Sequence, residues 1–235
     1  AVAWAVWNTD DAERLDSSSG GVFSLLARRT LAQGGAVFGA ALDEAMAVRH
    51  VCARSEEELA PLRGSKYVQS DLGDSFRQVK ALLEEGTQVL FTGTPCQVDG
   101  LKRYLGKDDP NLLTCDLVCH GVPSPAVFRA YLDNLEAAHG SKVVSVRFKD
   151  KSHGWSHPWF TAEFADGGVY TEDFNRTGYG RGFGMQLFLR PACAKCRYTS
   201  TSRPADFTLA DYWGLDEKLA LPVERDKGVS MVLVN

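Results

Sequence analysis

The chain has 235 residues, and its 44% hydrophobic content is enough to bury a core as one large domain or two small ones. The formal net charge is −4 and the basic residues are scattered along the sequence, which argues against a nucleic-acid partner. The first apolar run, residues 1–7, is too short for a signal peptide or a membrane span, so we expect a cytoplasmic protein without a membrane partner.

Hydrophobic periodicity predicts alternating strands and helices in the first half of the chain. Short apolar runs predict strands at 1–7, 36–42, 46–53, 88–91 and 112–118. Apolar residues at helical spacing predict helices at 22–32, 56–62, 74–85, 95–104 and 125–138. The stretch 88–138 is a βαβα pattern, which implies that its strands are parallel neighbours.

The second half follows a different pattern. Residues 143–148, 160–164 and 169–171 alternate like antiparallel strands, with Asp166-Gly167-Gly168 as a turn. Further strand-like runs occupy 206–214 and 229–235. We therefore predict an α/β fold: a mixed sheet with a parallel βαβα core in the first half, and antiparallel strands plus a cysteine-containing loop in the second. Both ends fall in strand-like runs, so we expect a piece truncated at both ends.

Two of the six cysteines lie where strands of the parallel core end. Cys96 falls in the first turn of the helix that follows Gly93-Thr94-Pro95, where unpaired backbone N–H groups favour a thiolate. Cys119 closes the next strand. If the strands are parallel neighbours, both thiols emerge at one edge of the sheet, where ligands of open α/β folds collect.

Cys193 and Cys196 indicate a metal or redox site more specifically, because a gap of two residues lets both sulfurs reach one metal. A zinc half-site, an iron–sulfur half-site and a redox dithiol all remain open from the spacing. A reducing compartment and only six cysteines favour metal or redox chemistry over disulfides. Cys52 and Cys115 lie within strands and are interpreted as core residues, with Cys115 as a reserve ligand.

Two loops combine small, polar and basic residues in a way that suits a phosphate-bearing cofactor. Residues 17–21, Ser-Ser-Ser-Gly-Gly, precede a helix, whose N–H groups can hold a pyrophosphate; the alternative is a plain helix cap. Residues 63–70 add a flexible backbone, a cation at Lys66 and an aromatic face at Tyr67, which would suit a flavin; the alternative is a solvated loop.

Six motifs in fixed order resemble the beta subunit family of coenzyme F420 hydrogenase/dehydrogenase: SSGGVFS, RGSKYVQS, VLFTGTPCQVDGLK, DLVCHGVPSP, CAKC and DFTLADYWG. The resemblance covers nearly the whole chain. It implies an iron–sulfur flavoprotein oxidoreductase that moves electrons between a [4Fe-4S] cluster, FAD and a two-electron acceptor such as coenzyme F420 or another small molecule. It also implies a ferredoxin-like domain or a redox partner subunit.

The resemblance further implies roles for particular residues. The cluster ligands would be Cys96, Cys119, Cys193 and Cys196. The flavin surroundings would be Ser18, Ser19, Gly20, Gly21, Ser65, Lys66, Tyr67, Gln69, Thr92, Gly93, Thr94 and Pro95. Residues 1–70 would form the flavin-side segment and 71–235 the segment with the four cysteines, within one compact unit. Two alternatives are a non-catalytic electron-transfer subunit and a zinc-stabilised binding domain.

Overall fold

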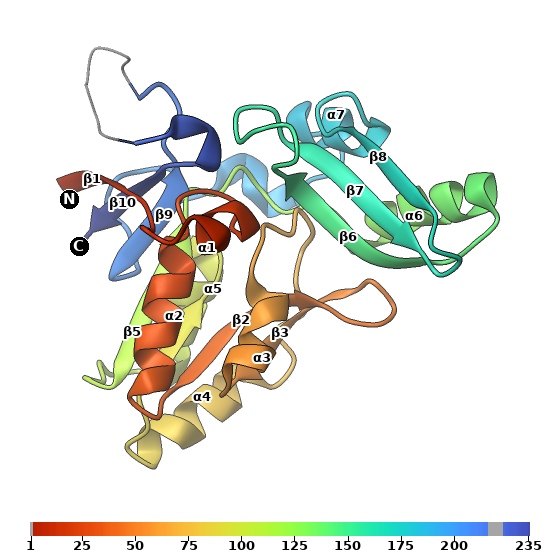
Figure 1. The fold of residues 1–235 in the computed structure, drawn as a ribbon. Helices are drawn as coiled ribbons and strands as arrows, with labels where there is room; N and C mark the ends of the chain where they lie inside the picture. Colours follow the sequence, from red (N-terminus) through yellow and green to blue (C-terminus); the bar gives the residue numbers. More distant parts are fainter. Residues whose placement is uncertain (1, 216–222) are drawn as a thin grey trace.

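The fold is described from a computed structural model, which covers residues 2–215 and 223–235. It confirms the predicted α/β class. The chain forms a seven-stranded mixed sheet and a separate three-stranded antiparallel sheet, each with its own helices (Figure 1).

The seven-stranded sheet draws strands from both ends of the chain. Its spatial order is β1 (Val2–Val6), β10 (Ser230–Val234), β9 (Phe207–Asp211), β5 (Leu112–Leu117), β4 (Val89–Thr92), β2 (Ala36–Leu42) and β3 (Val48–Ala53). The four strands β9, β5, β4 and β2 run parallel, whereas β1, β10 and β3 pair antiparallel with their neighbours. The predicted parallel pairing of β4 with β5 is confirmed, and β2 and β3 form a hairpin.

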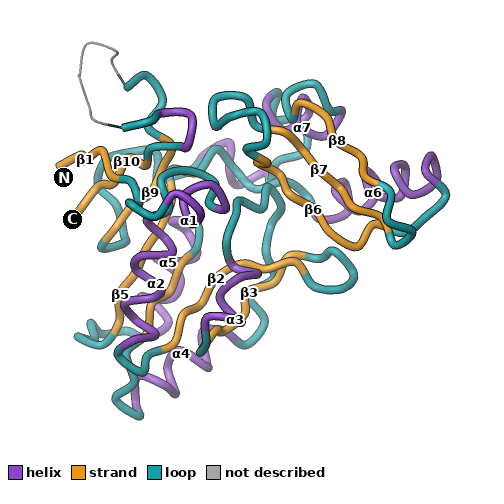
Figure 2. Tube along the Cα trace, in the orientation of Figure 1, coloured by secondary structure: helices purple, strands orange, loops and turns teal. Residues whose placement is uncertain are grey.

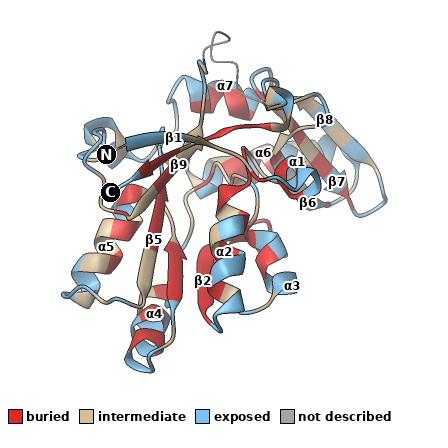
Figure 3. Ribbon diagram, turned by 60° about the vertical axis from the view of Figure 1, so that its left-hand side comes forward, coloured by how far each residue is buried: buried red, intermediate tan, exposed pale blue. Residues whose placement is uncertain are grey.

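Helices cover both faces of this sheet, because its central strands are apolar on both sides. On one face, Val37 and Leu90 pack with α2 (Val22–Ala32), α3 (Glu56–Leu59) and the short 3₁₀ helix η1 (Ala60–Leu62). On the other face, Phe38 and Phe91 pack with α4 (Ser75–Glu84) and α5 (Pro95–Leu105). Figure 2 shows α2 and α3 lying along the sheet, and Figure 3 shows the buried residues concentrated in its strands.

The three-stranded sheet consists of β6 (Val143–Asp150), β7 (Trp159–Phe164) and β8 (Val169–Asp173), packed with α6 (Pro125–His139) and α7 (Gly178–Gly184). Its aromatic core includes Phe128, Phe148, Phe160 and Tyr179. Met46, Val48 and Val68 from the other side of the molecule join the same core. The segments 1–70 and 71–235 therefore share both the seven-stranded sheet and this core.

Two helices were not predicted from the sequence. Helix α1 (Asp11–Asp16) lies between the first predicted strand and the Ser-rich turn, and Asp10 caps it by accepting from the N–H groups of Ala12 and Glu13. Helix α7 is rich in glycine, which favours neither helix nor strand. Its formation depends on tertiary contacts: Thr177 caps Gly180, and a Cβ at Gly180 would lie 1.8 Å from the Phe174 carbonyl oxygen.

The helices of the described ranges were also compared with what a bilayer requires. None of them is both long and apolar enough to cross a membrane.

Candidate functional site

Cys96 and Cys119 lie at the same edge of the seven-stranded sheet. Cys96 is the second residue of α5, which follows β4, and Cys119 comes two residues after β5 ends. The strands β4 and β5 are parallel neighbours, so their carboxyl ends meet. The Gly93 N–H donates to the Cys115 carbonyl at 3.1 Å, which extends the pairing to the turn before Cys96.

A short backbone pairing brings the second cysteine motif to Cys119. Pro123 and Leu189 form an isolated antiparallel bridge, flanked by hydrogen bonds from Arg190 N to the Val122 oxygen at 2.9 Å and from Ser124 N to the Phe188 oxygen at 3.1 Å. The 3₁₀ helix η2 (Pro191–Lys195) begins directly after this bridge and contains Cys193. The pairing joins segments that are far apart in sequence, and no local pattern signals it.

Gly121 permits this close approach. Its φ is 138°, in the region that favours glycine, and a Cβ there would lie 2.6 Å from Cδ1 of Leu189. The Gly-Val-Pro turn after Cys119 therefore leaves room for the Leu189 side chain.

Cys119 lies within electrostatic range of Cys96, Cys193 and Cys196. Burial raises the pKa of the Cys119 thiol to about 11, a hydrogen bond from the Gly121 backbone lowers it, and negative charge on Cys96, Cys193 and Cys196 raises it. The thiol of Cys96 also lies 3.2 Å from Oγ1 of Thr94. The structure thus brings together the four thiols that the sequence singled out.

Four thiols are a donor set that suits either a [4Fe-4S] cluster or a structural zinc ion, since both are held by four cysteine thiolates. Within the described residues, no three His, Cys, Asp or Glu side chains are gathered closely enough to hold a single metal ion.

The remaining two cysteines occupy the positions expected of packing residues. Cys115 is buried in the core on the α2 side of the sheet, and burial strongly raises its pKa. Cys52 is half-buried and packs with the α4 side.

Side-chain bonds fix the cysteine loop to the sheet. The Tyr198 hydroxyl donates to Asp99 of α5 at 2.6 Å. Arg203 donates to the carbonyl oxygens of Tyr198 at 2.7 Å and Leu117 at 2.8 Å, and it forms an ion pair with Asp116 at 3.2 Å. The loop is therefore attached to the helix that bears Cys96 and to the strand that precedes Cys119.

The two loops predicted to surround a flavin contact each other. Both the backbone N–H and the hydroxyl of Ser65 bond to Oγ of Ser18, at 2.6 Å and 2.9 Å. Ser18, Ser65 and Lys66 line a cavity of about 370 Å³, closed on the other side by residues 144–149 of β6. A cavity of this size between two substructures is typical of cofactor sites, which occupy about 300–1,000 Å³.

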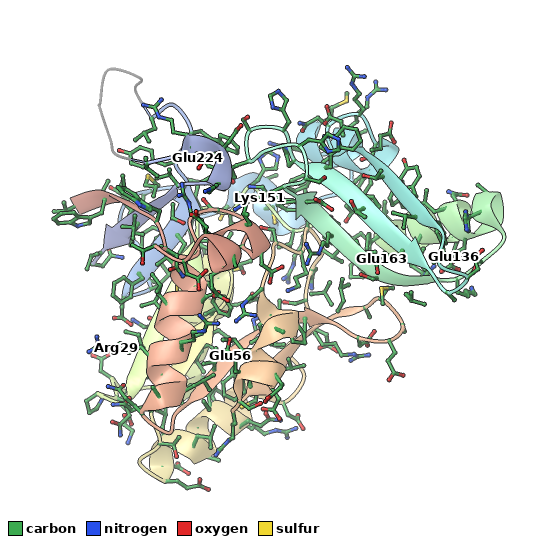
Figure 4. The ribbon with its side chains drawn as sticks, in the orientation of Figure 1. Arg29, Glu56, Glu136, Lys151, Glu163 and Glu224 are labelled. Carbon is green, nitrogen blue, oxygen red and sulfur yellow. The ribbon has the colours of Figure 1, made fainter. Side chains whose placement is uncertain are left out.

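Ser19 and Gly20 are engaged elsewhere. The Ser19 hydroxyl donates to the Val229 oxygen at 2.9 Å, and the Gly20 N–H donates to Oγ of Ser230 at 2.9 Å. The Ser19 carbonyl accepts from Lys151, whose ammonium also binds the carbonyl oxygens of Arg14 and Lys227 (Figure 4). Gly21 adopts a φ of 83° before α2. Of this motif, only Ser18 lines the cavity.

Among the basic residues that line the cavity, Lys66 has a shifted pKa. Its ammonium donates to the carbonyl oxygens of Pro61 and Arg63, both at 2.7 Å. The side chain is half-buried, and burial of the charged group lowers its pKa to about 7. Lys66 can therefore exchange a proton near neutral pH.

The other predicted residues form the connection between the cavity and the cysteines. Tyr67 packs in an aromatic cluster with Phe148, Phe174 and Phe183. The Gln69 N–H donates to the Pro123 oxygen at 2.9 Å, in the turn after Cys119.

At the other side of the site, Pro95 starts α5, and the N–H of Thr94 donates to Oε1 of Gln97 at 2.9 Å. Gln97, which sequence reasoning missed, also donates to Oγ of Ser70 at 2.8 Å. Ser70 comes five positions after Ser65, so their Cα atoms are at most about 18 Å apart. The cavity and the cysteine site are therefore close together.

His50 is a second residue that the sequence did not single out. Its Nε2 lies 2.9 Å from the Thr92 carbonyl oxygen, and its ring stacks on Phe91. Burial lowers its pKa, so the ring is neutral and donates this bond. His50 thereby holds Thr92 and the turn through Gly93 that leads to Cys96.

Residues 86–235 match the family model for the C-terminal part of the coenzyme F420 hydrogenase/dehydrogenase beta subunit. The chain belongs to this family. The matched region includes all four cysteines of the site.

A solved structure shares the fold of this F420 hydrogenase/dehydrogenase family member. It is the xenon-derivatised F420-reducing [NiFe] hydrogenase complex from Methanosarcina barkeri, which aligns with a TM-score of 0.66 at 19% identity, over 100% of this chain and 75% of that chain. No curated protein sequence matches the chain.

Proposed function

We propose that the protein is an iron–sulfur flavoprotein oxidoreductase. The observation that carries the proposal is the convergence of Cys96, Cys119, Cys193 and Cys196 at the carboxyl edge of the parallel strands. These four thiols would hold a [4Fe-4S] cluster, and the cavity lined by Ser18, Ser65 and Lys66 would hold FAD. Family membership supports the redox role.

The two cofactors together would supply conversion between single electrons and electron pairs, since a flavin exchanges both. The protein's own residues would bind and orient the two cofactors. Cys96 stands in the first turn of α5, and the Gly121 backbone hydrogen bond lowers the pKa of the Cys119 thiol against the larger effect of burial. Lys66 would supply positive charge or a proton to a flavin in the cavity. The two-electron acceptor would be coenzyme F420 or another small molecule, and a ferredoxin-like domain or redox partner subunit would exchange single electrons.

The ligand assignment predicts that Cys193→Ser with Cys196→Ser removes the cluster. Serine binds iron poorly compared with thiolate, and two remaining thiols do not hold four irons. After anaerobic reconstitution with iron and sulfide, we expect the wild type to show the charge-transfer absorption and paramagnetic signal of a [4Fe-4S] centre and the double variant to lose both.

The matched control is Cys52→Ser with Cys115→Ser, which removes the same number of thiols from the core. It should retain the cluster in the fraction that folds, as judged by circular dichroism. An undiminished cluster in the Cys193/Cys196 variant would refute the ligand assignment. Zinc without acid-labile sulfide in the wild type would identify a zinc-stabilised domain instead, and a cluster without bound flavin would identify an electron-transfer subunit.

The flavin assignment predicts that FAD protects Lys66 from acetylation. Because its pKa is lowered to about 7, the Lys66 amine is largely neutral at pH 8, and its reactivity should rise as the pH passes 7. Peptide mass mapping after brief treatment with acetic anhydride, with and without FAD, measures this. Lys151 is the control: burial also lowers its pKa to about 7, but three carbonyls enclose its ammonium. Equal Lys66 labelling with and without FAD would contradict the assignment.

A further inference from the structure

The segment that contains Cys193 and Cys196 differs in charge from the rest of the chain. Between Asp173 and Asp206 the sequence has no acidic residue and six basic ones: Arg176, Arg181, Arg190, Lys195, Arg197 and Arg203. Without these six of its 26 basic residues, the chain has 20 basic against 30 acidic residues, a formal charge of −10. The basic residues are therefore not as evenly scattered as the sequence first indicated.

Most of these cations are exposed and unneutralised. Arg176 forms an ion pair with Asp173, and Arg203 with Asp116. The side chains of Arg181, Arg190, Lys195 and Arg197 are exposed and form no ion pair with any residue of the described ranges.

Three of these four lie close to the two cysteines in sequence: Arg190 comes three positions before Cys193, Lys195 lies between the cysteines, and Arg197 follows Cys196. Asp99 on the neighbouring α5 is bonded to Arg103 and to the Tyr198 hydroxyl, and the charge of Arg197 also acts on it. One carboxylate therefore faces several cations, and the loop keeps a net positive charge.

Exposed apolar side chains accompany the charge. Leu117 and Val118, at the end of β5, are exposed, although they directly precede the site. Arg203 binds the carbonyl oxygens of both Leu117 and Tyr198, so the end of β5 lies beside the Arg197–Tyr198 segment. Met185 and Leu187, just before Arg190, are exposed as well. Arginine, methionine and apolar residues at one surface are typical of protein interfaces.

We propose that the exposed cations Arg190, Lys195 and Arg197, with Leu117 and Val118, form the docking surface for an acidic electron-carrier protein. The proposal rests on the proposed function, since the surface surrounds the four thiols that would hold the cluster. Charge complementarity selects the occupant: a patch of positive charge on a negative chain attracts acidic proteins and repels basic ones. Each docking event passes one electron from the carrier, which is oxidised, to the site, which is reduced, and two events supply a two-electron acceptor.

A competing explanation is that these cations offset the negative charge of a bound cluster. Compensating groups would be turned towards the thiols and would change the cluster potential when removed. Exposure of Arg190, Lys195 and Arg197 to solvent favours docking instead. Only the docking explanation predicts that affinity and electron-transfer rate depend on the charge of the carrier.

The test measures association and electron transfer with a small acidic [2Fe-2S] ferredoxin as the probe. Association with immobilised ferredoxin is measured first, on protein with and without reconstituted cluster. The rate of electron transfer from reduced ferredoxin to reconstituted protein is then measured by stopped flow. We expect both to weaken by about 10-fold or more between about 20 and 300 mM NaCl. Association with cytochrome c, a basic carrier, should show the opposite salt dependence.

The decisive variant is Arg190→Glu, Lys195→Glu, Arg197→Glu, which should lower the low-salt rate and affinity by at least about 10-fold and abolish their salt dependence. The control, Arg29→Glu, Arg54→Glu, Lys107→Glu, makes the same change in net charge at exposed positions elsewhere; Arg29 is labelled on α2 in Figure 4. An equal loss in both variants would overturn the proposal, and so would a change in cluster potential with unchanged ferredoxin affinity.

Failure of the proposed function is recognised separately. If iron and sulfide analysis finds no cluster but ferredoxin association is salt-dependent and lost in the triple variant, the docking surface stands and the cluster assignment fails. If the cluster forms and ferredoxin association is unaffected by the variant, the docking surface is wrong and the cluster assignment stands.

Discussion

Replacement of Arg203 with alanine is expected to lower the free energy of unfolding by about 3–5 kcal/mol, because it leaves a buried carboxylate without its counter-ion. The Arg203 side chain is 5% exposed and that of Asp116 is fully buried. Burial raises the pKa of Asp116, while the charge of Arg203 lowers it. The same guanidinium holds the carbonyl oxygens of Leu117 and Tyr198, so the variant also releases the cysteine loop.

Urea denaturation followed by circular dichroism measures this change. Arg197→Ala is the matched control, since Arg197 is exposed and lies six residues away on the same loop; its effect should stay within about 0.5 kcal/mol. Adding Asp116→Asn to Arg203→Ala should recover part of the loss, because the unpaired charge is removed. A loss below about 1 kcal/mol for Arg203→Ala would show that the pair contributes little.

The secondary structure could be predicted wherever one periodicity dominated. The bounds of α2 and β2 agree with the sequence-based ones, because apolar residues at helical spacing are followed by two glycines and a short apolar run. Helix α7 could not be predicted in this way. What makes its glycines helical is the cap from Thr177 and the close approach of Gly180 to Phe174, and neither contact is local enough to leave a periodic pattern.

The sequence predicted the part of the candidate site that follows from the order of the parallel strands. Successive strands of a βαβ unit end at one edge, which places Cys96 beside Cys119. The arrival of Cys193 and Cys196 at that edge depends on the pairing of Pro123 with Leu189, which strand patterns do not reveal. Gln97 and His50 escaped notice for a related reason. Their roles come from single hydrogen bonds to Ser70 and Thr92, not from a motif.

A glycine-rich turn before a helix has two interpretations that the sequence does not separate: a phosphate cradle, or a turn packed too tightly for a side chain. Gly20 follows the second interpretation. A Cβ there would lie 2.5 Å from the Val6 oxygen and 2.7 Å from the Ser230 nitrogen, both backbone atoms of the β1–β10 pair. Its own N–H is occupied by Oγ of Ser230.

We therefore expect Gly20→Ala to destabilise the protein by about 1–3 kcal/mol or more, since two strand backbones would have to move to admit the methyl group. Thermal denaturation should show a fall of about 2–4 °C for each kcal/mol lost in a chain of this size. Gly184→Ala is the control: Gly184 ends α7, a Cβ there meets nothing within 4 Å, and alanine favours helix more than glycine does. Gly184→Ala should leave the melting temperature unchanged or raise it slightly. If Gly20→Ala melts like the wild type yet binds FAD more weakly, Gly20 acts at the cofactor after all, and the packing of β1 and β10 tolerates the methyl group.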